Sequence, residues 1–515
     1  MVKVLYVPLD ERPCNYKYPK LISEMTDDIK MLIPPSEYMG KLKNPANIEK
    51  LWSWVFENVK EAKYAILSID TLVYGNIINS RIHHKTKDEC EKYLSNIKKI
   101  KDINPGIEIH AFNLVARVAN YDSSAEDPDY WESYGSKIWE YSYLMDKINR
   151  KHANTNEEKE FEELKNIIPA DILKDFLDRR IVDRYVNLEC INYVKEGIID
   201  YLVIPKDDTA EYGYAALDQS AISKKVFEYN IMDRVMVYPG ADEVGCILFA
   251  RVFNRIKNYI PKVYTRYSST LGPFVVPRYE DRPLNEGVKA QITSMGGICV
   301  DTAAESDFLF AVNSPGKFMI ECGDQFNNKD LTFNTYTNLH EFLRYINYYI
   351  DNFKKPCAIA DVAFSNGADN EFMEYANKVG VLEKVCAYGG WNTSENTNGV
   401  CLAQACVESY YETYGWGKDK KILSKEFLIR KIVEDWLFQA NTLYELAGYK
   451  EEFIDFNAYD VRNCEDKVVE LMEKLLRKNI NKKLGGKFLG KKIEFNSLSL
   501  PWDRIFDIDF NISLV

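Results

Sequence analysis

Two adjacent aspartates are the residues whose types and spacing point most directly to chemistry. Asp207 and Asp208 follow the apolar run Tyr201–Ile204 and precede Thr209. Neighbouring strand residues point to opposite faces, so both carboxyl groups can serve one pocket only where the strand gives way to a loop. Like charges held close together raise one pKa, and a carboxyl group that stays protonated near neutral pH can act as a general acid. The alternative is an N-cap aspartate beside a solvated one.

Other polar residues also come directly after apolar runs. They are Asp10, Glu11, Arg12, Asp70, Tyr74, Asn76, Arg117, Asp242, Glu243, Asp361, Asn366, Trp391 and Asn392. Ligands of parallel α/β folds bind at the carboxyl ends of the strands, so we interpret these residues as candidate substrate-binding groups. Each one, taken singly, also fits a loop or a helix N-cap. Many carboxylates at one edge would repel one another unless they served a cation, a sugar or proton transfer.

The aromatic residue of this set favours a sugar as the ligand. Trp391 stands between Gly390 and Asn392, and Asn396 follows. A tryptophan face flanked by amide and carboxylate groups commonly holds a sugar ring, because stacking and polar contacts then act together. A tryptophan buried in the core is the alternative reading.

The elements that must position these residues are short apolar runs separated by charged, amphipathic stretches. Such alternation is typical of buried parallel strands and helices, and it predicts an α/β protein whose N-terminal part is a (β/α)-barrel or a parallel sheet. The expected strands are Val2–Val7, Ile29–Ile33, Tyr64–Ile69, Ile107–Leu114, Tyr201–Ile204, Val235–Tyr238, Val263–Tyr267, Phe308–Val312, Cys357–Ala360 and Val385–Tyr388. Helices are expected between them, for example over Ile48–Lys60 and Glu89–Lys101.

The length of 515 residues indicates more than one domain. We predict a catalytic α/β domain over residues 1–260, carrying a helical insertion at about 122–190. A second α/β region over residues 261–415 is expected to contribute to the site. Residues 416–515 are expected to be mostly helical and to end in an antiparallel strand.

Composition excludes several classes of protein. Lys and Arg number 66 against 78 Asp and Glu, a net charge of −12, which argues against sequence-independent binding of nucleic acid. No apolar run is long enough to span a membrane, and the N-terminal run is too short for a signal peptide. The eleven cysteines include no C-x-x-C pair, which argues against a disulfide framework. We therefore expect a cytoplasmic protein that does not enter a membrane.

Other catalytic and cofactor motifs are absent from the sequence. The five histidines lack the spacing of a zinc site, and neither a phosphate-binding loop, a dinucleotide fingerprint nor a nucleophile elbow occurs. We expect no cofactor. Mg²⁺ or Ca²⁺ held by Asp70, Asp207 or Asp242 stays open, because hard cations accept clustered carboxylates.

The strand-end motifs resemble those of a bacterial protein family of unknown function, DUF4127. The matching segments are PLDERPCN (8–15), IDTLVYGN (69–76) with Ser80-Arg81, KDDTAEYG (206–213), YPGADE (238–243), ADVAFSNGADN (360–370) and YGGWNT (388–393). The resemblance covers most of the chain and implies that these motifs belong together. It implies no reaction, because the family has no established activity.

A second resemblance concerns mechanism and is confined to the aspartate pair. Asp207-Asp208 is similar to the catalytic pair of O-GlcNAcase-type N-acetylglucosaminidases. That resemblance implies that Asp207 polarises a 2-acetamido group and that Asp208 protonates the leaving oxygen. The expected function is that of a glycoside hydrolase acting on a small sugar such as an N-acetylhexosaminide. The alternatives are a divalent-metal-dependent hydrolase or lyase and a non-catalytic sugar-binding protein.

Overall fold

The computed structural model describes residues 1–453 and 456–515 and divides into two compact units. Unit 1 comprises Met1–Glu11, Lys30–Val244 and Tyr279–Asp281. Unit 2 comprises Arg12–Ile29, Gly245–Arg278 and Arg282–Val515. Each unit contains its own parallel sheet, so the predicted α/β class is confirmed.

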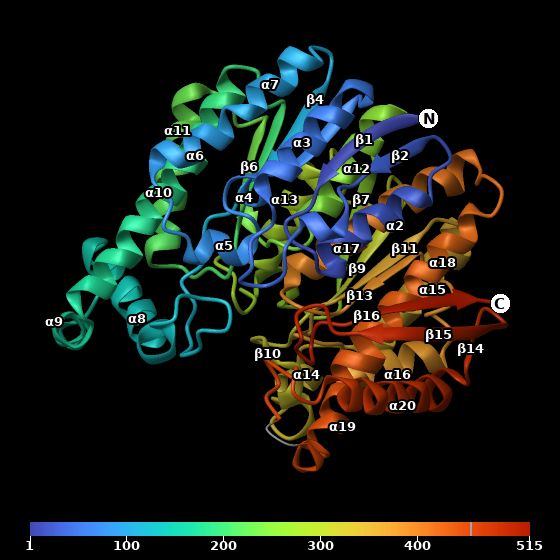
Figure 1. The fold of residues 1–515 in the computed structure, drawn as a ribbon. Helices are drawn as coiled ribbons and strands as arrows, with labels where there is room; N and C mark the ends of the chain where they lie inside the picture. Colours follow the sequence, from blue (N-terminus) through green and yellow to red (C-terminus); the bar gives the residue numbers. More distant parts are fainter. Residues whose placement is uncertain (454–455) are drawn as a thin grey trace. The chain divides into compact units, whose positions relative to one another are not determined.

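The sheet of unit 1 has six strands in the order β2-β1-β3-β4-β5-β6 (Figure 1). The strands are β1 (Val2–Val7), β2 (Ile29–Leu32), β3 (Tyr64–Ser68), β4 (Glu108–Phe112), β5 (Tyr201–Lys206) and β6 (Val235–Pro239). Strands β1, β3, β4, β5 and β6 run parallel. In the described sheet β2 and β6 are edges, so of the two predicted arrangements the structure shows the open parallel sheet.

The helices of unit 1 connect these strands. They are α3 (Ile48–Asn58), α4 (Ile69–Val73), α5 (Ile77–Ile82), α6 (Lys87–Leu94), α7 (Asn96–Ile103), α8 (Trp131–Asn149), α9 (Thr155–Ile167), α10 (Ala170–Lys195) and α11 (Tyr214–Tyr229), with 3₁₀ turns at Ser36–Tyr38 and Val59–Glu61. Helices α8 and α9 project away from the sheet, and α10 returns the chain to β5 (Figure 1). Trp131, Ile138 and Phe176 form a small apolar core inside this projection.

The helix expected over Glu89–Lys101 is two helices, α6 and α7, which meet at Ser95. A capping box between Thr86 and Glu89 starts α6. At its end the Ser95 hydroxyl donates to the Lys92 carbonyl, an interaction that competes with continued helical bonding. Apolar periodicity continues across the break, which explains why one helix was predicted.

Unit 2 contains a five-stranded parallel sheet in the order β13-β11-β9-β7-β8. Its strands are β7 (Lys262–Tyr267), β8 (Ile298–Cys299), β9 (Phe308–Asn313), β11 (Cys357–Asp361) and β13 (Ala387–Gly389). Two short strands, β10 (Ile320–Glu321) and β12 (Phe364–Ser365), pair separately. The chain ends in the antiparallel strands β14 (Lys487–Phe488), β15 (Lys491–Ser499) and β16 (Asp509–Leu514).

The helices of unit 2 enclose a large apolar core that includes Leu309, Ile359, Phe372 and Trp436. They are α1 (Pro13–Tyr16), α2 (Tyr18–Glu24), α12 (Val244–Lys257), α13 (Leu284–Ser294), α14 (Thr332–Thr335), α15 (Leu339–Phe353), α16 (Asn370–Lys378), α17 (Ser394–Tyr414), α18 (Lys420–Lys431), α19 (Leu443–Ala447) and α20 (Glu465–Leu484), with 3₁₀ turns at Gly272–Phe274, Cys322–Phe326 and Lys450–Glu452. Between α18 and α19 lies a π-helix, η5 (Ile432–Thr442). Extended π-helices are rare and often mark functional segments.

No helix in the described ranges 1–453 and 456–515 is long and apolar enough to cross a membrane. All eleven cysteines are free thiols, and most of them are buried.

Candidate active site at the end of strand β5

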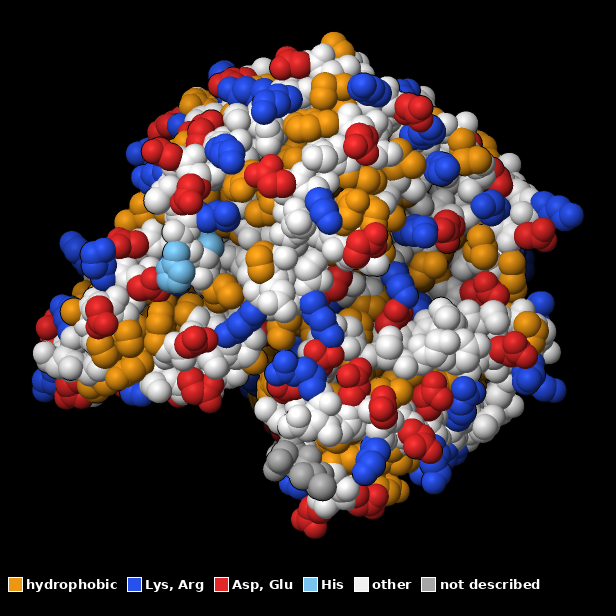
Figure 2. Space-filling view, viewed as in Figure 1, with side chains coloured by type: hydrophobic (Ala, Val, Ile, Leu, Met, Phe, Trp, Pro, Cys, Tyr) orange, Lys and Arg blue, Asp and Glu red, His pale blue; other side chains and the backbone are white. Residues whose placement is uncertain are grey.

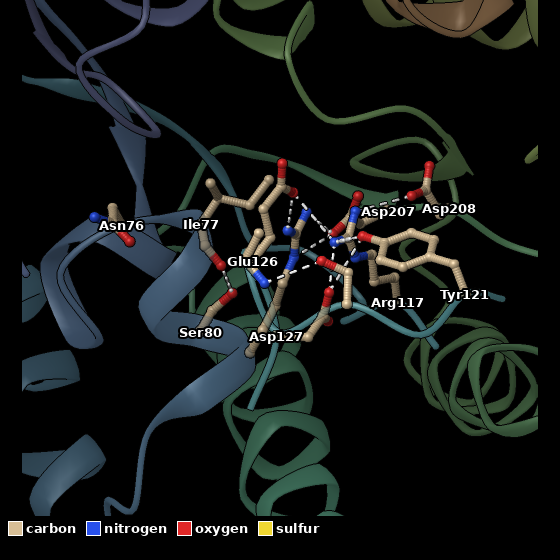
Figure 3. Close-up of polar contacts among 12 residues, drawn as sticks. Asn76, Ile77, Ser80, Arg117, Tyr121, Glu126, Asp127, Asp207 and Asp208 are labelled. Atoms are coloured by element: carbon tan, nitrogen blue, oxygen red, sulfur yellow. Dashed lines mark hydrogen bonds and ion pairs between the residues drawn. The ribbon is translucent and has the colours of Figure 1, made fainter. Parts of the chain in front are cut away.

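Asp207 and Asp208 come directly after β5, which ends at Lys206. Asp207 continues the sheet, since its N–H donates to the Val115 carbonyl at 3.3 Å. Asp208 has a φ of +26°, outside the range of an extended strand. This change of backbone direction brings both side chains into one group of polar residues (Figure 3).

Asp207 is held by Arg81, which lies in the last turn of α5. The Nε and Nη2 atoms of Arg81 donate to Oδ2 of Asp207 at 3.0 and 2.6 Å. The third nitrogen, Nη1, donates to Glu126 at 2.8 Å. Both partners of the Arg81–Asp207 pair are buried, so the guanidinium fixes the orientation of this carboxylate.

Asp208 is held by Arg117, which follows β4 in the chain. Arg117 Nη1 donates to Asp208 Oδ2 at 3.0 Å, and Nη2 donates to Asp127 at 2.6 Å and to Glu126 at 3.1 Å. Nη2 also contacts the hydroxyl group of Tyr121. Figure 3 shows Arg117 with Tyr121, Asp127 and Asp208 arranged around it. We call Arg81, Arg117, Glu126, Asp127, Asp207 and Asp208 the acid–arginine cluster.

The acid–arginine cluster holds four carboxyl groups and two guanidinium groups. Burial and the neighbouring charge of Asp207 raise the pKa of Asp208 to about 6, against the opposing effect of Arg117 and Arg81. The side chain of Asp208 is 26% exposed and that of Asp207 only 9%. Asp208 is therefore the more accessible of the two carboxyl groups, and it can gain or lose a proton near neutral pH.

Three predicted binding residues lie in or just after helix α4, in the chain segment between β3 and α5. Asp70 accepts hydrogen bonds from the Asn113 amide at 3.1 Å and from the Leu114 N–H at 3.0 Å. Burial raises its pKa to about 8 despite these bonds. The two hydrogen bonds connect the segment after β3 with the segment after β4. With a pKa of about 8, the Asp70 carboxyl group is protonated at neutral pH.

Tyr74 and Asn76 contact other protein groups. The Tyr74 ring stacks on His83, with 4.4 Å between centroids, and is buried. Asn76 caps α5, because its side-chain oxygen accepts from the Asn79 N–H at 2.8 Å and its amide donates to the Leu42 carbonyl at 2.9 Å. Since Arg81 lies on α5, Asn76 helps to position the acid–arginine cluster.

Four further predicted residues of unit 1 lie at the ends of β1 and β6. Glu11 accepts a hydrogen bond from the Leu42 N–H at 3.2 Å, and Asp10 is fully buried. Glu243 is also fully buried, and burial together with the charge of Asp242 raises its pKa to about 8. Unit 1 therefore holds a second acid, besides Asp70, that is protonated at neutral pH.

A family model described as "Protein of unknown function (DUF4127)" matches residues 4–511. The chain belongs to the DUF4127 family. This membership confirms the resemblance carried by the strand-end motifs. A search of the curated proteins finds no match to the chain.

In unit 2 of this DUF4127 protein, Asp361 ends strand β11 as predicted. It accepts from the Asn313 amide at 2.8 Å and from the Asp369 N–H at 2.9 Å. Burial and the charge of Asp369 raise its pKa well above the usual range. The guanidinium of Arg12 lies 4.3 Å from the ring centroid of Trp502.

Trp391 and Asn392 lie in a tightly held loop after β13. The Gly390 N–H donates to Asp435 at 2.8 Å, and the Thr397 hydroxyl donates to the Trp391 carbonyl at 2.7 Å. The Asn392 carbonyl accepts from the Asn366 N–H at 3.1 Å, and Asn392 has a left-handed φ of +71°. The loop therefore presents a half-buried tryptophan in a fixed backbone conformation.

Sequence reasoning did not name three members of the acid–arginine cluster as site residues. Arg81 lies in the segment after IDTLVYGN, and its spacing from Asn76 on a short helix could have indicated its role. Glu126 and Asp127 lie in a loop before α8, far from any strand, and no local signal marks them. Within the described ranges there is no group of three or more His, Cys, Asp or Glu side chains arranged to hold a metal ion.

Proposed function

We propose that this DUF4127 protein is a glycoside hydrolase acting on a small sugar, with Asp208 as the general acid. The observation that carries the proposal is the pairing of a fixed Asp207 with a more accessible Asp208 whose pKa is raised to about 6. Paired carboxyl groups in different environments are the usual arrangement for acid and base roles in glycoside hydrolysis.

The two carboxyl groups fit different roles because they have different partners. Arg81 occupies Oδ2 of Asp207, which leaves Oδ1 to accept a hydrogen bond from the N–H of a 2-acetamido group. The acetamido oxygen would then attack the anomeric carbon while the glycosidic C–O bond breaks. Asp208 would transfer its proton to the leaving oxygen.

The second half of the reaction returns the proton to Asp208. Water attacks the anomeric carbon of the cyclic intermediate, and the bond to the acetamido oxygen breaks. The Asp208 carboxylate takes the proton from this water and is restored as the acid. Arg117 stabilises the carboxylate form between the two steps, because its guanidinium donates to Oδ2.

Trp391 is proposed as a sugar-stacking residue of unit 2. Its half-buried ring and the three backbone hydrogen bonds that hold its loop support this role. A rigid aromatic side chain binds a sugar ring with little loss of conformational entropy.

We also propose a cytoplasmic location. The eleven free thiols support it, because buried unpaired cysteines are typical of proteins that fold in a reducing compartment.

The test is turnover of aryl N-acetylhexosaminides and of other aryl glycosides by the purified protein. We expect release of the aryl alcohol, and a loss of about 100-fold or more in kcat for Asp208→Asn. The exposed Asp102→Asn on α7 is the matched control and should keep full activity. Binding of sugars without any turnover, or unchanged turnover by Asp208→Asn, would contradict the proposal.

A further inference from the structure

Unit 1 contains a cavity of about 510 Å³ that the roles proposed above do not use. The end of α5, the loop before α8 and the first turns of α10 line it. Ile82, Pro128, Tyr130 and Ile172 form its apolar walls. Figure 2 shows histidine side chains on this face of unit 1 beside acidic and hydrophobic side chains. The volume lies within the range of small-ligand sites.

One wall of the cavity is built around Arg179, a buried residue of α10. Arg179 Nη2 donates to Asp175 at 2.6 Å, and Nη1 donates to the Tyr130 hydroxyl oxygen at 3.1 Å. Nε donates to the His83 carbonyl at 2.7 Å. The Tyr130 hydroxyl in turn donates to Asp175 at 2.8 Å. The guanidinium is thus engaged by the wall itself and is not directed at an anionic ligand.

The remaining charges of the lining leave one carboxylate, that of Asp171, without a basic partner among the described residues. Lys43 pairs with Asp129 at 3.1 Å, and Arg179 pairs with Asp175. Asp171, in the first turn of α10, has no ion pair within the described part of the chain. His84 Nδ1 also lies 3.4 Å from Asp175, so each carboxylate of the lining except Asp171 already faces a basic side chain, and Asp171 is the one left to meet a positive charge.

We propose that this cavity binds a protonated amino sugar. The Asp171 carboxylate accepts hydrogen bonds from the ammonium group, and the Tyr130 and Ile172 side chains pack against the carbon face of the ring. Charge-assisted hydrogen bonds of this kind are the stronger ones in proteins, and the aromatic wall supplies the apolar contact that a sugar ring needs.

The cavity and the acid–arginine cluster share two backbone segments. Arg81 of the cluster precedes Ile82 of the cavity, and Asp127 of the cluster precedes Pro128. We therefore assign the cavity as the subsite for an amine-bearing part of the substrate. This assignment rests on the hydrolase function proposed above, whereas the binding of an amine does not.

The experiment measures binding of glucosamine, glucose and cyclohexylamine by titration calorimetry at low salt, below neutral pH, where the amines are protonated. We expect glucosamine to bind more tightly than either of the others, because only glucosamine combines the charge with the hydroxyl groups. Asp171→Asn should weaken glucosamine binding about tenfold or more, since a hydrogen bond between charged groups is lost, and should leave glucose binding unchanged.

Asp178→Asn is the matched control. Asp178 lies on the same helix and is exposed, but it pairs with Lys174 and does not line the cavity. Thermal melting of both variants checks that loss of an acidic residue from the first turn of α10 has not unfolded the helix. An equal effect of the two substitutions on glucosamine binding, or equal binding of glucosamine and glucose by the wild type, would overturn the proposal.

The binding result and the turnover result separate the two proposals. Glucosamine binding that depends on Asp171, without turnover of any aryl glycoside, supports the amine site and contradicts the hydrolase. Turnover without a preference for the amine contradicts the amine site and supports the hydrolase.

Discussion

Arg81 directs two of its nitrogen atoms to a single carboxylate oxygen of Asp207, at 3.0 and 2.6 Å. Both side chains are buried, and both Arg81 contacts go to Oδ2 rather than to the second oxygen of Asp207. A flexible ammonium group cannot reproduce this fork of two donors.

Arg81→Lys should therefore lower activity while keeping the charge. We expect kcat on an aryl glycoside to fall about tenfold or more, because Asp207 loses one of the two hydrogen bonds that orient it. Arg184→Lys on α10, where the arginine is partly exposed, is the control and should change little. Full activity in Arg81→Lys would show that the orientation of Asp207 is irrelevant to the reaction.

The pH dependence of activity should follow the protonation of Asp208. The acid must be protonated to act, so activity should fall as the pH rises above about 6. Arg117 stabilises the ionised form and lowers this pKa, so Arg117→Gln should raise the pKa and move the alkaline limb to higher pH. The measurement is kcat/KM against pH for both proteins, with Arg184→Gln as control. A shift of the limb to lower pH would contradict the assignment.

Asp70 should make the protein less stable as the pH rises. Its pKa is raised to about 8 in the folded state, against about 3.9 in an unfolded chain. The stabilisation that Asp70 adds to the free energy of unfolding is therefore largest below about pH 4, and it is lost as the pH rises through about 8. The loss is on the order of a few kcal/mol.

Asn at position 70 cannot ionise and removes this dependence. Urea unfolding of the wild type and of Asp70→Asn at about pH 5 and about pH 8 provides the comparison. The wild type should lose more stability between the two pH values than the variant loses. Parallel changes in both proteins would show that other groups account for the effect.

Gly390→Ala should disturb the loop that carries Trp391. A Cβ atom at position 390 would lie 2.6 Å from the Tyr388 hydroxyl oxygen, and Tyr388 is fully buried. We expect a loss of about 1 to 3 kcal/mol in stability, with a change in tryptophan fluorescence. At Gly106 the nearest atom would be 3.8 Å away, so Gly106→Ala is the control. Equal melting temperatures of the two variants would contradict the prediction.

Chelation should leave activity unchanged. The carboxylates of the acid–arginine cluster are engaged by Arg81 and Arg117, and such pairing competes with metal coordination. Assay of the protein after dialysis against EDTA, with and without added Mg²⁺ or Mn²⁺, provides the test. Loss of turnover that either ion restores would favour the metal-dependent hydrolase or lyase.

The sequence predicted several strands well because their apolar runs are short, β-branched and fully buried. Val4 to Val7 and Leu202 to Ile204 are examples. It could not distinguish an open sheet from a barrel, since closure depends on pairing between the first and last strands rather than on any single strand. The helix break at Ser95 was missed because the apolar periodicity of the sequence continues across it. The break itself is marked only by the hydrogen bond from the Ser95 hydroxyl to the Lys92 carbonyl.

The candidate site was predicted only in part, because some of its residues are brought together by tertiary structure alone. Asp207, Asp208 and Arg117 follow strands, and the topology of a parallel sheet places them at one edge. Glu126 and Asp127 reach the same cluster through a loop whose path follows from tertiary packing. Burial also depends on tertiary structure, so the raised pKa of Asp70 or Glu243 has no signature in the sequence.

The interleaving of the two units has a consequence for synthesis on the ribosome. Residues 12–29 emerge early but belong to unit 2, where Tyr18 contacts Glu434 and Lys17 contacts Asp509. These partners lie 416 and 492 residues further along the chain. Helices α1 and α2 must therefore wait, unpaired with their final neighbours, until the chain has been translated as far as Asp509. Such long-range closure slows folding and prolongs the exposure of the apolar face of α2 to chaperones.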